Sequence, residues 1–456
     1  MQWLMLVGTF VVMAVLQRLA RGGPLEARAT LALGFLALVA YLAGTIAQRL
    51  RLPRIVGYLL AGLVAGPAWL RLVHADELQV LAPISSGALS LIAFAVGLEL
   101  TAEVLRRDRR RTVGRIVAGA IAIPFAAVTL VVLTVSPWFP LTAHQPFRDA
   151  LVVALSLGTL AAVSSPTLTW SVINDLGAQG PLSRTTLDVS IVQDIVAVLL
   201  VIVIVAIAVP IASPGAVTPG IAGSTLLVFG GSLVAGVALG LAAAQYLRAI
   251  RGQLALVLVI FAFVAVQAVR LLGLDPVLLA LAAGCALRNT APEHGDRVRA
   301  ELKRCAIPVY VVFFALAGSN LQLDVLAEVW PWALLLTGLR IAGLRGGLRW
   351  AGSGKQPAVG ADWVNYGWLG LVPQGGLAIT LAAVLRRAFP EWNVSLEALL
   401  LAMIGVQQLA GPICFQWVLQ HTGELTHVSE GSHDRETPGT TEHPGPSGIV
   451  VAGGRM

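Results

Sequence analysis

Long apolar segments, separated by short breaks rich in charged residues, proline and glycine, fill the first 420 residues of the chain. A bilayer core about 30 Å thick needs roughly 20 apolar residues per transmembrane helix. Fourteen segments come close to this length: 2–19, 29–47, 54–71, 81–100, 113–137, 148–171, 184–208, 222–247, 254–271, 275–289, 303–321, 328–350, 364–388 and 397–420. The pattern predicts an all-α polytopic membrane protein with about 13–14 transmembrane helices.

The composition agrees with a chain that is surrounded mostly by lipid. Of its 456 residues, 57% are hydrophobic and 12% are charged, whereas soluble domains carry about 25% charged residues. The net charge of +7 comes from basic residues between the apolar segments, which differs from the basic face of a nucleic-acid-binding protein. The C-terminal tail has no glycine-rich phosphate loop. We therefore expect the bilayer as a partner, no nucleic acid and no cofactor.

The distribution of arginine and lysine predicts the orientation in the membrane. Loops after even-numbered segments carry about twenty basic residues and the others about eight, and the basic loops are usually cytoplasmic. We therefore expect both termini in the cytoplasm and the chain in an inner (plasma) membrane. Arg18, Arg21 and Arg28 disagree with this arrangement, which leaves open whether residues 2–19 span the membrane or form an interfacial or signal-anchor helix.

An internal repeat predicts how the segments are organised. VGLELTAEVL at 96–105 corresponds to AGSNLQLDVL at 317–326, and the offset of seven helices inverts the second copy in the membrane. Three divisions are predicted. Residues 1–28 are an extra N-terminal helix, and residues 421–456 are a disordered cytoplasmic tail. Between them, residues 29–420 are an exchanger domain with repeats at 29–208 and 254–420 and a linker helix at 222–247.

The sixth and thirteenth segments correspond in this repeat, and both are interrupted near their middles. One contains Ser165-Pro166 and the other contains Pro373, Gln374 and Gly375. Proline removes a backbone donor and glycine permits unwinding, so each helix is expected to break there. A lone proline is more often a simple kink. Two breaks in corresponding positions favour a site for a small ion, since freed carbonyls and half-helix ends can bind one.

Asp194 lies about ten residues into the seventh segment, or roughly 15 Å along a helix, near the expected bilayer centre. A charge there is costly, so ion or proton transport is the leading interpretation and a buried structural pair is the alternative. Such a carboxylate can hold a proton or an alkali cation, but not both at once. Ser164, Ser165 and Thr167 offer further hard oxygen ligands for that cation.

One basic residue, Arg340, is also embedded in an apolar segment. It can pair with a carboxylate, cap the carbonyl end of the broken thirteenth helix, or set the electrostatic potential of the site. Arg345 is a rival for this position, although it lies closer to the cytoplasmic end. Gln193 precedes Asp194 and is an uncharged hydrogen-bonding neighbour that could also merely pack between helices.

These motifs resemble the cation:proton antiporters of the Kef and NapA type, the sodium/hydrogen exchanger domain. The strings that carry the resemblance are LRLPRIVGYLLAGLVAGP (50–67), LIAFAVGLEL (91–100), SSPTLT (164–169), VQDIVAV (192–198), FFALAGSNLQLD (313–324) and PQGGLAITLA (373–382). The resemblance implies an inverted-repeat antiporter fold with two crossed discontinuous helices. It also implies a core domain that moves against a dimerisation domain, and hence a homodimer.

By position, the resemblance marks Asp194 as the essential ion-binding aspartate and Gln193 as the residue that is glutamine in Kef-type proteins. Arg340 matches a basic residue of the equivalent late helix, and Thr167 matches the polar residues of the first break. The chain departs from Kef-type proteins in lacking a nucleotide-binding regulatory domain, and from NapA-like proteins in its extra N-terminal segment.

The expected function is secondary active exchange of H⁺ for Na⁺ or K⁺ by alternating access, with cation and proton competing for Asp194. A single acid in the motif predicts an electroneutral cycle. An uncoupled or channel-like potassium efflux pathway is one alternative, and a membrane-embedded enzyme for lipid-linked substrates is another. An enzyme would need at least two catalytic groups converging near the membrane surface, and the deepest acid here has no such cluster.

Overall fold

The computed structural model describes most of the chain, namely residues 2–20, 22–100, 107–143, 145–212, 219–249, 271–304, 306–321, 323–353, 361–375, 378, 381–382, 385 and 393–425. Within these ranges every regular element is a helix, as the sequence predicts. The expected tail from residue 426 onward and nearly all of the segment 254–271 lie outside them, as do Glu103 and the residues next to it.

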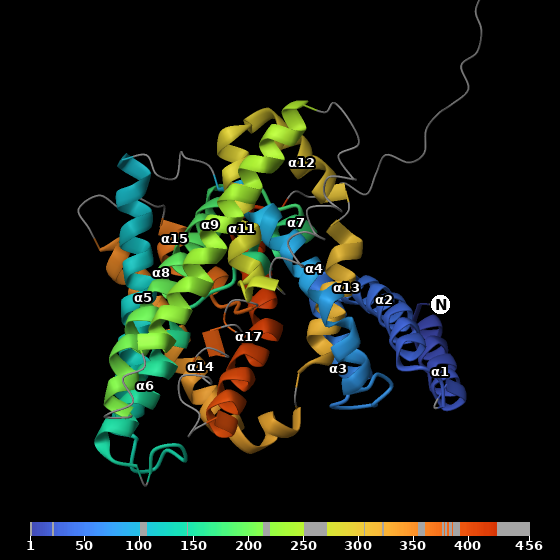
Figure 1. Cartoon of the computed structure of the whole chain (residues 1–456), viewed down its shortest axis with the longest axis horizontal. Coiled ribbons are helices and arrows are strands. Elements are labelled where there is room, and N and C mark those ends of the chain that lie inside the picture. The colour runs from blue at the N-terminus through green and yellow to red at the C-terminus, as the bar shows by residue number, and fades with distance from the viewer. Residues whose placement is uncertain are drawn as a thin grey trace, which may run out of the picture. The chain divides into compact units, whose positions relative to one another are not determined.

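The described helices follow one another along the chain (Figure 1). They are α1 (Gln2–Ala20), α2 (Leu25–Arg49), α3 (Arg54–Ala65), α4 (Ala75–Glu99), α5 (Arg107–Thr134), α6 (Phe147–Ala161), α7 (Pro166–Leu176), α8 (Pro181–Ala212), α9 (Pro219–Ala249), α11 (Pro276–Thr290), α12 (Pro292–Arg304), α13 (Ala306–Ser319), α14 (Leu323–Gly352), α15 (Ala361–Tyr366), the 3-10 helix η2 (Gly367–Leu371) and α17 (Asn393–His421). Apart from 254–271, every predicted apolar segment overlaps one of these helices.

Not every predicted segment forms a full-length membrane helix. Six helical spans in the described part of the chain are long and apolar enough to cross a bilayer, whereas α3 and α11 are shorter apolar helices. The basic loop after the tenth segment, which contains Arg297, forms the charged helix α12, and this helix meets α13 at an angle of 63°. The apolar segments of the sequence therefore show where the helices lie but do not predict how long each helix is.

The two halves of the bundle pack in equivalent ways, as an inverted repeat requires. Helix α3 lies against α13 and helix α11 lies against α4. A Cβ atom on Gly62 of α3 would meet the carbonyl oxygen of Ala315, and one on Gly284 of α11 would meet that of Phe94. Backbones in each pair touch because glycine leaves room, which is the usual basis of close helix packing in membranes.

The next pair of helices crosses at glycines from both partners. A Cβ atom on Gly119 of α5 would meet the carbonyl oxygen of Gly347 of α14, and one on Gly347 would meet that of Gly119. Together with α6, α8 and α17, these two helices enclose a second apolar core that includes Val128, Leu157 and Leu400. The core reaches the first predicted break at Ala161 and Val163.

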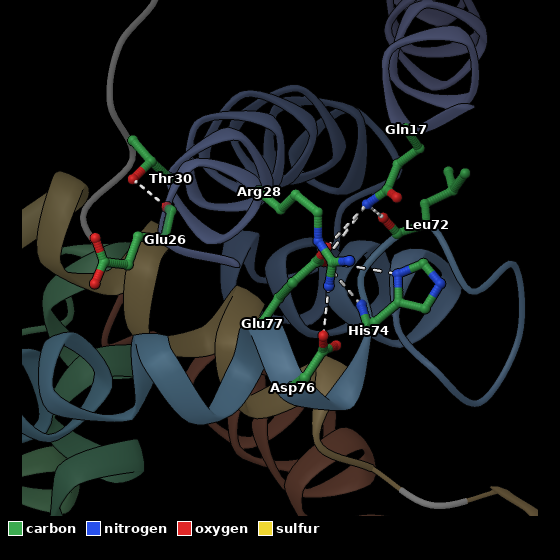
Figure 2. A network of polar contacts seen from close by, with 8 residues as sticks. All are labelled: Gln17, Glu26, Arg28, Thr30, Leu72, His74, Asp76 and Glu77. Carbon is green, nitrogen blue, oxygen red and sulfur yellow. Dashed lines mark hydrogen bonds and ion pairs between the residues drawn. The ribbon is translucent and has the colours of Figure 1, made fainter. Parts of the chain in front are cut away.

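Helix α1 packs beside α2 and is attached by polar contacts to the start of α4 (Figure 2). The Gln17 side chain donates to the carbonyl oxygen of Leu72 at 2.6 Å. Arg28 of α2 forms ion pairs with Asp76 and, at 3.2 Å, with the fully buried carboxylate of Glu77. These ion pairs join the first turn of α2 to the start of α4.

The folded chain continues slightly beyond residue 421, where the tail was expected to begin. The Glu424 carboxylate accepts hydrogen bonds from the backbone N–H groups of Leu182 at 2.6 Å and Ser183 at 2.8 Å. These donors belong to the first turn of α8, whose N–H groups have no partners within the helix. Glu424 therefore caps α8 from the end of the chain, and the described fold reaches Leu425.

Candidate cation site at two broken helices

The first break separates α6 from α7. Helix α6 ends at Ala161, and α7 begins at Pro166 after a short non-helical segment. Ser165 is the N-cap of α7, and its hydroxyl accepts from the backbone N–H of Leu168 at 3.3 Å. Pro166 occupies the first helical position, where its missing N–H has no cost. The predicted interruption is therefore confirmed as two separate helices joined by an extended segment.

The second break follows η2. The helix ends at Leu371, and residues 372–375 have no helical structure. A Cβ atom on Gly375 would come within 2.5 Å of the Ser165 hydroxyl oxygen, so only glycine lets the two breaks approach this closely. Pro373 packs against α17, because a Cβ atom on Gly411 would lie 2.7 Å from its Cα atom. This predicted interruption is confirmed as well.

Hydrogen bonds join the two breaks directly. The Gln374 amide donates to the carbonyl oxygens of Leu160 at 2.8 Å and Val163 at 3.1 Å. The Thr169 hydroxyl of α7 lies 3.4 Å from the carbonyl oxygen of Gly370. Each break thus satisfies backbone groups that the other has freed, which buried non-helical backbone requires.

Asp194 of α8 lies next to the first break and is 2% exposed. Its carboxylate accepts a hydrogen bond from the backbone N–H of Ser164. The other carboxylate oxygen, Oδ1, and the Ser164 hydroxyl have no hydrogen-bond partner among the described residues. Ser165 and Thr167 hydrogen-bond to each other through their hydroxyl groups at 3.1 Å. The residues expected to bind the ion therefore lie at one crossing, and the acid keeps an unused oxygen.

Gln193 holds α8 against the same break. Its amide donates to the carbonyl oxygen of Ala162 at 2.7 Å and to that of Ala120 in α5 at 3.4 Å. The side chain is fully buried. Of the two interpretations that the sequence leaves open, the structure favours a hydrogen-bonding neighbour of the break over a residue that merely packs between helices.

Arg340 of α14 is fully buried between the two breaks. It donates to carbonyl oxygens at the ends of α6 and η2, at distances between 2.6 and 3.0 Å: those of Ala161, Val163, Leu371 and Val372. The fork of five N–H donors on a guanidinium suits several acceptors at once. Capping of carbonyl ends is therefore the observed role, and it extends to both broken helices.

The remaining contacts show which of Arg340 and Arg345 is the embedded basic residue. Arg340 also donates to the amide oxygen of Gln407 in α17 at 2.5 Å, and no ion pair with a carboxylate is seen in the described ranges. Arg345 is exposed and lies over the ring of Trp368, 5.9 Å from its centroid. Arg340 is the embedded base.

The sequence alone did not identify Asp275 as part of this region. Asp275 is the N-cap of α11, is 1% exposed, and accepts from the backbone N–H of Leu278 at 2.8 Å. It lies near enough to Asp194 for the two acidic groups to interact electrostatically. In the sequence, the Asp275-Pro276 pair indicates only the start of a helix. An acid buried in an apolar stretch was the signal that could have identified it.

The site has the chemistry of a small monovalent ion site. One carboxylate, hydroxyl oxygens and backbone carbonyls are hard oxygen donors. Among the described residues, no group of three or more His, Cys, Asp or Glu side chains is placed to hold a metal ion together. Asp194 is the one acid at the break itself, and a carboxylate beside neutral oxygens suits a cation with one charge better than a resident transition metal.

Comparison with known proteins agrees with the fold and the motifs. Na(+)/H(+)-K(+) antiporter GerN of Bacillus cereus is 27% identical over 361 residues, which are 75% of this chain and 86% of GerN. Probable Na(+)/H(+) antiporter GerT of the same organism is 30% identical over 160 residues, which cover 35% of this chain and 39% of GerT.

Solved structures show the same fold at low sequence identity. The sodium proton antiporter MjNhaP1 of Methanocaldococcus jannaschii aligns with a TM-score of 0.65 and 16% identity, over 90% of this chain and 99% of MjNhaP1. The sequence profile described as "Sodium/hydrogen exchanger, transmembrane" matches residues 34–420. The match spans both repeats and both breaks, and the chain therefore belongs to the transmembrane sodium/hydrogen exchanger family.

Proposed function

We propose that the protein is a secondary active antiporter that exchanges a monovalent cation, Na⁺ or K⁺, for H⁺. The observation that carries the proposal is the buried Asp194, whose Oδ1 atom is unpartnered at the crossing of two broken helices. Membership of the exchanger family and the likeness to GerN support it. These relatives are named antiporters, which favours transport over a membrane-embedded enzyme.

Competition for one carboxylate couples the two fluxes. Protonated Asp194 has no net charge and loses its attraction for a cation, whereas ionised Asp194 binds one through Oδ1 and the Ser164 hydroxyl. Ser165 and Thr167 lie one and three residues further along the same break and supply additional oxygens. Since proton and cation cannot occupy the carboxylate together, each conformational cycle carries one of them in each direction.

The two breaks keep a fixed geometry whether a proton or a cation is bound at Asp194, because they are held by Arg340, Gln374 and Gln193. Arg340 keeps its positive charge against carbonyl oxygens, so it does not compete with the transported cation for Asp194. Gln193 is neutral, so the motif holds one titrating acid. The expected exchange is one cation for one proton, which is electroneutral.

The expected assembly and topology complete the proposal. We infer that the protein is a homodimer in an inner (plasma) membrane. Alternating access arises when a core of helices α5–α8 and α14–α17 moves against the remaining helices. The contact of Glu424 with α8 supports placing the C-terminal end of α17 on the same side as the start of α8. Both positions follow even-numbered segments, which were predicted to end in the cytoplasm.

Transport by the full-length chain in proteoliposomes tests the proposal. A pH-sensitive dye inside the vesicles reports proton movement when Na⁺, K⁺ or Li⁺ is added. Wild-type protein should move protons in response to at least one cation, and Asp194→Asn should abolish the response. Asp188→Asn is the matched control, since this acid is also buried and lies on the same helix, one to two turns before Asp194.

Each outcome has a defined meaning. Cation-dependent proton movement that survives in Asp194→Asn would refute the assignment of the site. Cation flux without proton movement in the wild type would favour the channel-like potassium pathway. A change in rate when a membrane potential is imposed would contradict the electroneutral cycle.

A further inference from the structure

A groove lined only by apolar residues lies between α1, α2 and α3, far from the proposed cation site in sequence. Its volume is about 230 Å³. Leu6 and Phe10 of α1 form one wall, and Ala43, Ala47 and Val64 belong to the other walls on α2 and α3. An apolar groove of this kind in a membrane bundle excludes water and polar ligands, and it is filled most favourably by hydrocarbon.

Polar contacts hold α1 to the bundle at its C-terminal end, whereas the described contacts towards its N-terminus are apolar. Phe10 packs edge-on against Phe35 of α2 with 5.5 Å between ring centroids, and Met13 is 2% exposed. Gln17 then fixes the C-terminal end of α1 to Leu72 (Figure 2). Towards its N-terminus, α1 leaves a space beside α2 and α3, with Leu6 on its edge.

Exposed arginines mark one end of the groove. The turn between α2 and α3 contributes Leu50 and Leu52 to its lining, and Arg49 and Arg51 of the same turn are exposed. In the part of the chain that the structure describes, no carboxylate forms an ion pair with either guanidinium. Nearby Arg54, in contrast, forms an ion pair with the carboxylate of Asp175 at 3.9 Å.

The backbone of Arg51 is held in place although its side chain is exposed. Its φ angle is 60°, a left-handed conformation that is unusual for arginine. The amide of Gln416 in α17 donates to the Arg51 carbonyl oxygen at 2.9 Å, and the Arg51 N–H donates to Gln48 at 3.0 Å. The turn thus presents two cations at a fixed position beside an apolar groove.

We propose that this groove binds one acyl chain of an anionic phospholipid, whose phosphate lies against Arg49 and Arg51. The apolar lining matches the hydrocarbon, and the unpaired guanidinium groups match the phosphate, which arginine binds through parallel N–H donors. The turn follows the second apolar segment, on the side where basic residues are concentrated and anionic lipid is usual. The lipid would fasten α1 at the end that Gln17 does not reach.

Native mass spectrometry of the detergent-purified full-length protein tests the proposal. Dioleoyl phosphatidylglycerol and dioleoyl phosphatidylcholine are added separately, and retained lipid is counted. The wild type should retain phosphatidylglycerol in preference to phosphatidylcholine. Arg49→Gln with Arg51→Gln should remove this preference, since one basic residue near an anionic headgroup is worth about a fivefold change in binding. Val64→Trp should fill the groove and reduce the retention of both lipids.

Matched controls separate the site from general effects. Arg71→Gln changes another exposed arginine with positive φ, 53°, beyond the opposite end of α3. Leu130→Trp places a tryptophan on an exposed position of α5. Both should retain lipid as the wild type does. Unchanged phosphatidylglycerol retention in either groove variant, or an equal loss in its control, would overturn the proposal. The arginine pair is exposed, so its replacement tests the site even when Val64→Trp fails to fold.

Discussion

The guanidinium of Arg340 donates to the carbonyl oxygen of Val163 at 2.6 Å, across 177 residues of sequence. This carbonyl belongs to the extended segment that separates α6 from α7, and it also accepts from Gln374 of the other break at 3.1 Å. One backbone group thus connects the embedded base to both discontinuous helices. Val163 precedes Ser164, whose backbone N–H donates to Asp194. The hydrogen bonds that join the two breaks therefore lie one residue away from the residue that holds the proposed ion-binding carboxylate.

Replacement of Arg340 should destabilise the whole site. Arg340→Met removes the guanidinium donor from four buried carbonyl oxygens, of which that of Val163 keeps a second donor, Gln374. We expect a loss of more than about 3 kcal/mol in unfolding free energy together with loss of transport. Arg340→Lys should recover only part of both, because three donors on one nitrogen cannot reproduce the fork. The unfolding temperature in detergent, followed by tryptophan fluorescence, measures the effect. Arg345→Met is the control and should unfold like the wild type.

Loss of the bridge between the breaks should be milder. Gln374→Leu is similar in volume but removes the donor to the Leu160 and Val163 carbonyl oxygens. We expect about 1–3 kcal/mol of destabilisation and slower cation-dependent proton movement in proteoliposomes. Asn289→Leu removes an exposed amide that bonds backbone oxygens elsewhere in the chain, so it serves as a comparison. Equal effects of the two substitutions would contradict a special role of Gln374.

Close approach of the breaks can be tested by adding one methyl group. In Gly375→Ala the new Cβ atom lies 2.5 Å from the Ser165 hydroxyl oxygen, so the breaks must separate and transport should fall. Adding Ser165→Ala removes that oxygen and should restore part of the lost activity, despite the loss of the α7 cap, which is worth about 1 kcal/mol. Gly346→Ala, whose nearest contact is at 3.7 Å, should behave as the wild type. A double variant no better than Gly375→Ala alone would argue against this contact.

The cap on α8 predicts a measurable role for the end of the folded chain. Glu424→Ala frees the N–H groups of Leu182 and Ser183, and we expect about 1–3 kcal/mol of destabilisation because both donors are buried. Glu293→Ala changes an exposed glutamate in α12 and should have little effect. Thermal unfolding of the two variants checks the difference. A chain that ends at Leu425 keeps the cap and should unfold as the full-length protein does.

Sequence reasoning located the breaks and the buried charges, for which the signals are local. Proline and glycine within apolar segments identified both breaks, and the cost of a charge in lipid identified Asp194 and Arg340. It failed where the signal depends on partners distant in sequence. Asp275 was not recognised as part of the site region, and the partners of Arg340 remained open among three interpretations. The cap that Glu424 provides for α8 was not predicted, because Glu424 lies in a polar stretch and its partners Leu182 and Ser183 are 242 and 241 residues away in the sequence.

The sequence by itself determined a helical membrane protein with two interrupted helices and one deeply placed acid, because apolar length, helix breakers and buried charge act through neighbouring residues and the surrounding lipid. Only the tertiary structure decided which carbonyl oxygens Arg340 caps, that Gln374 ties one break to the other, and that Asp275 lies near Asp194. These contacts join segments as far as 214 residues apart. They depend on how closely glycine lets the helices pack, and no local pattern specifies that distance.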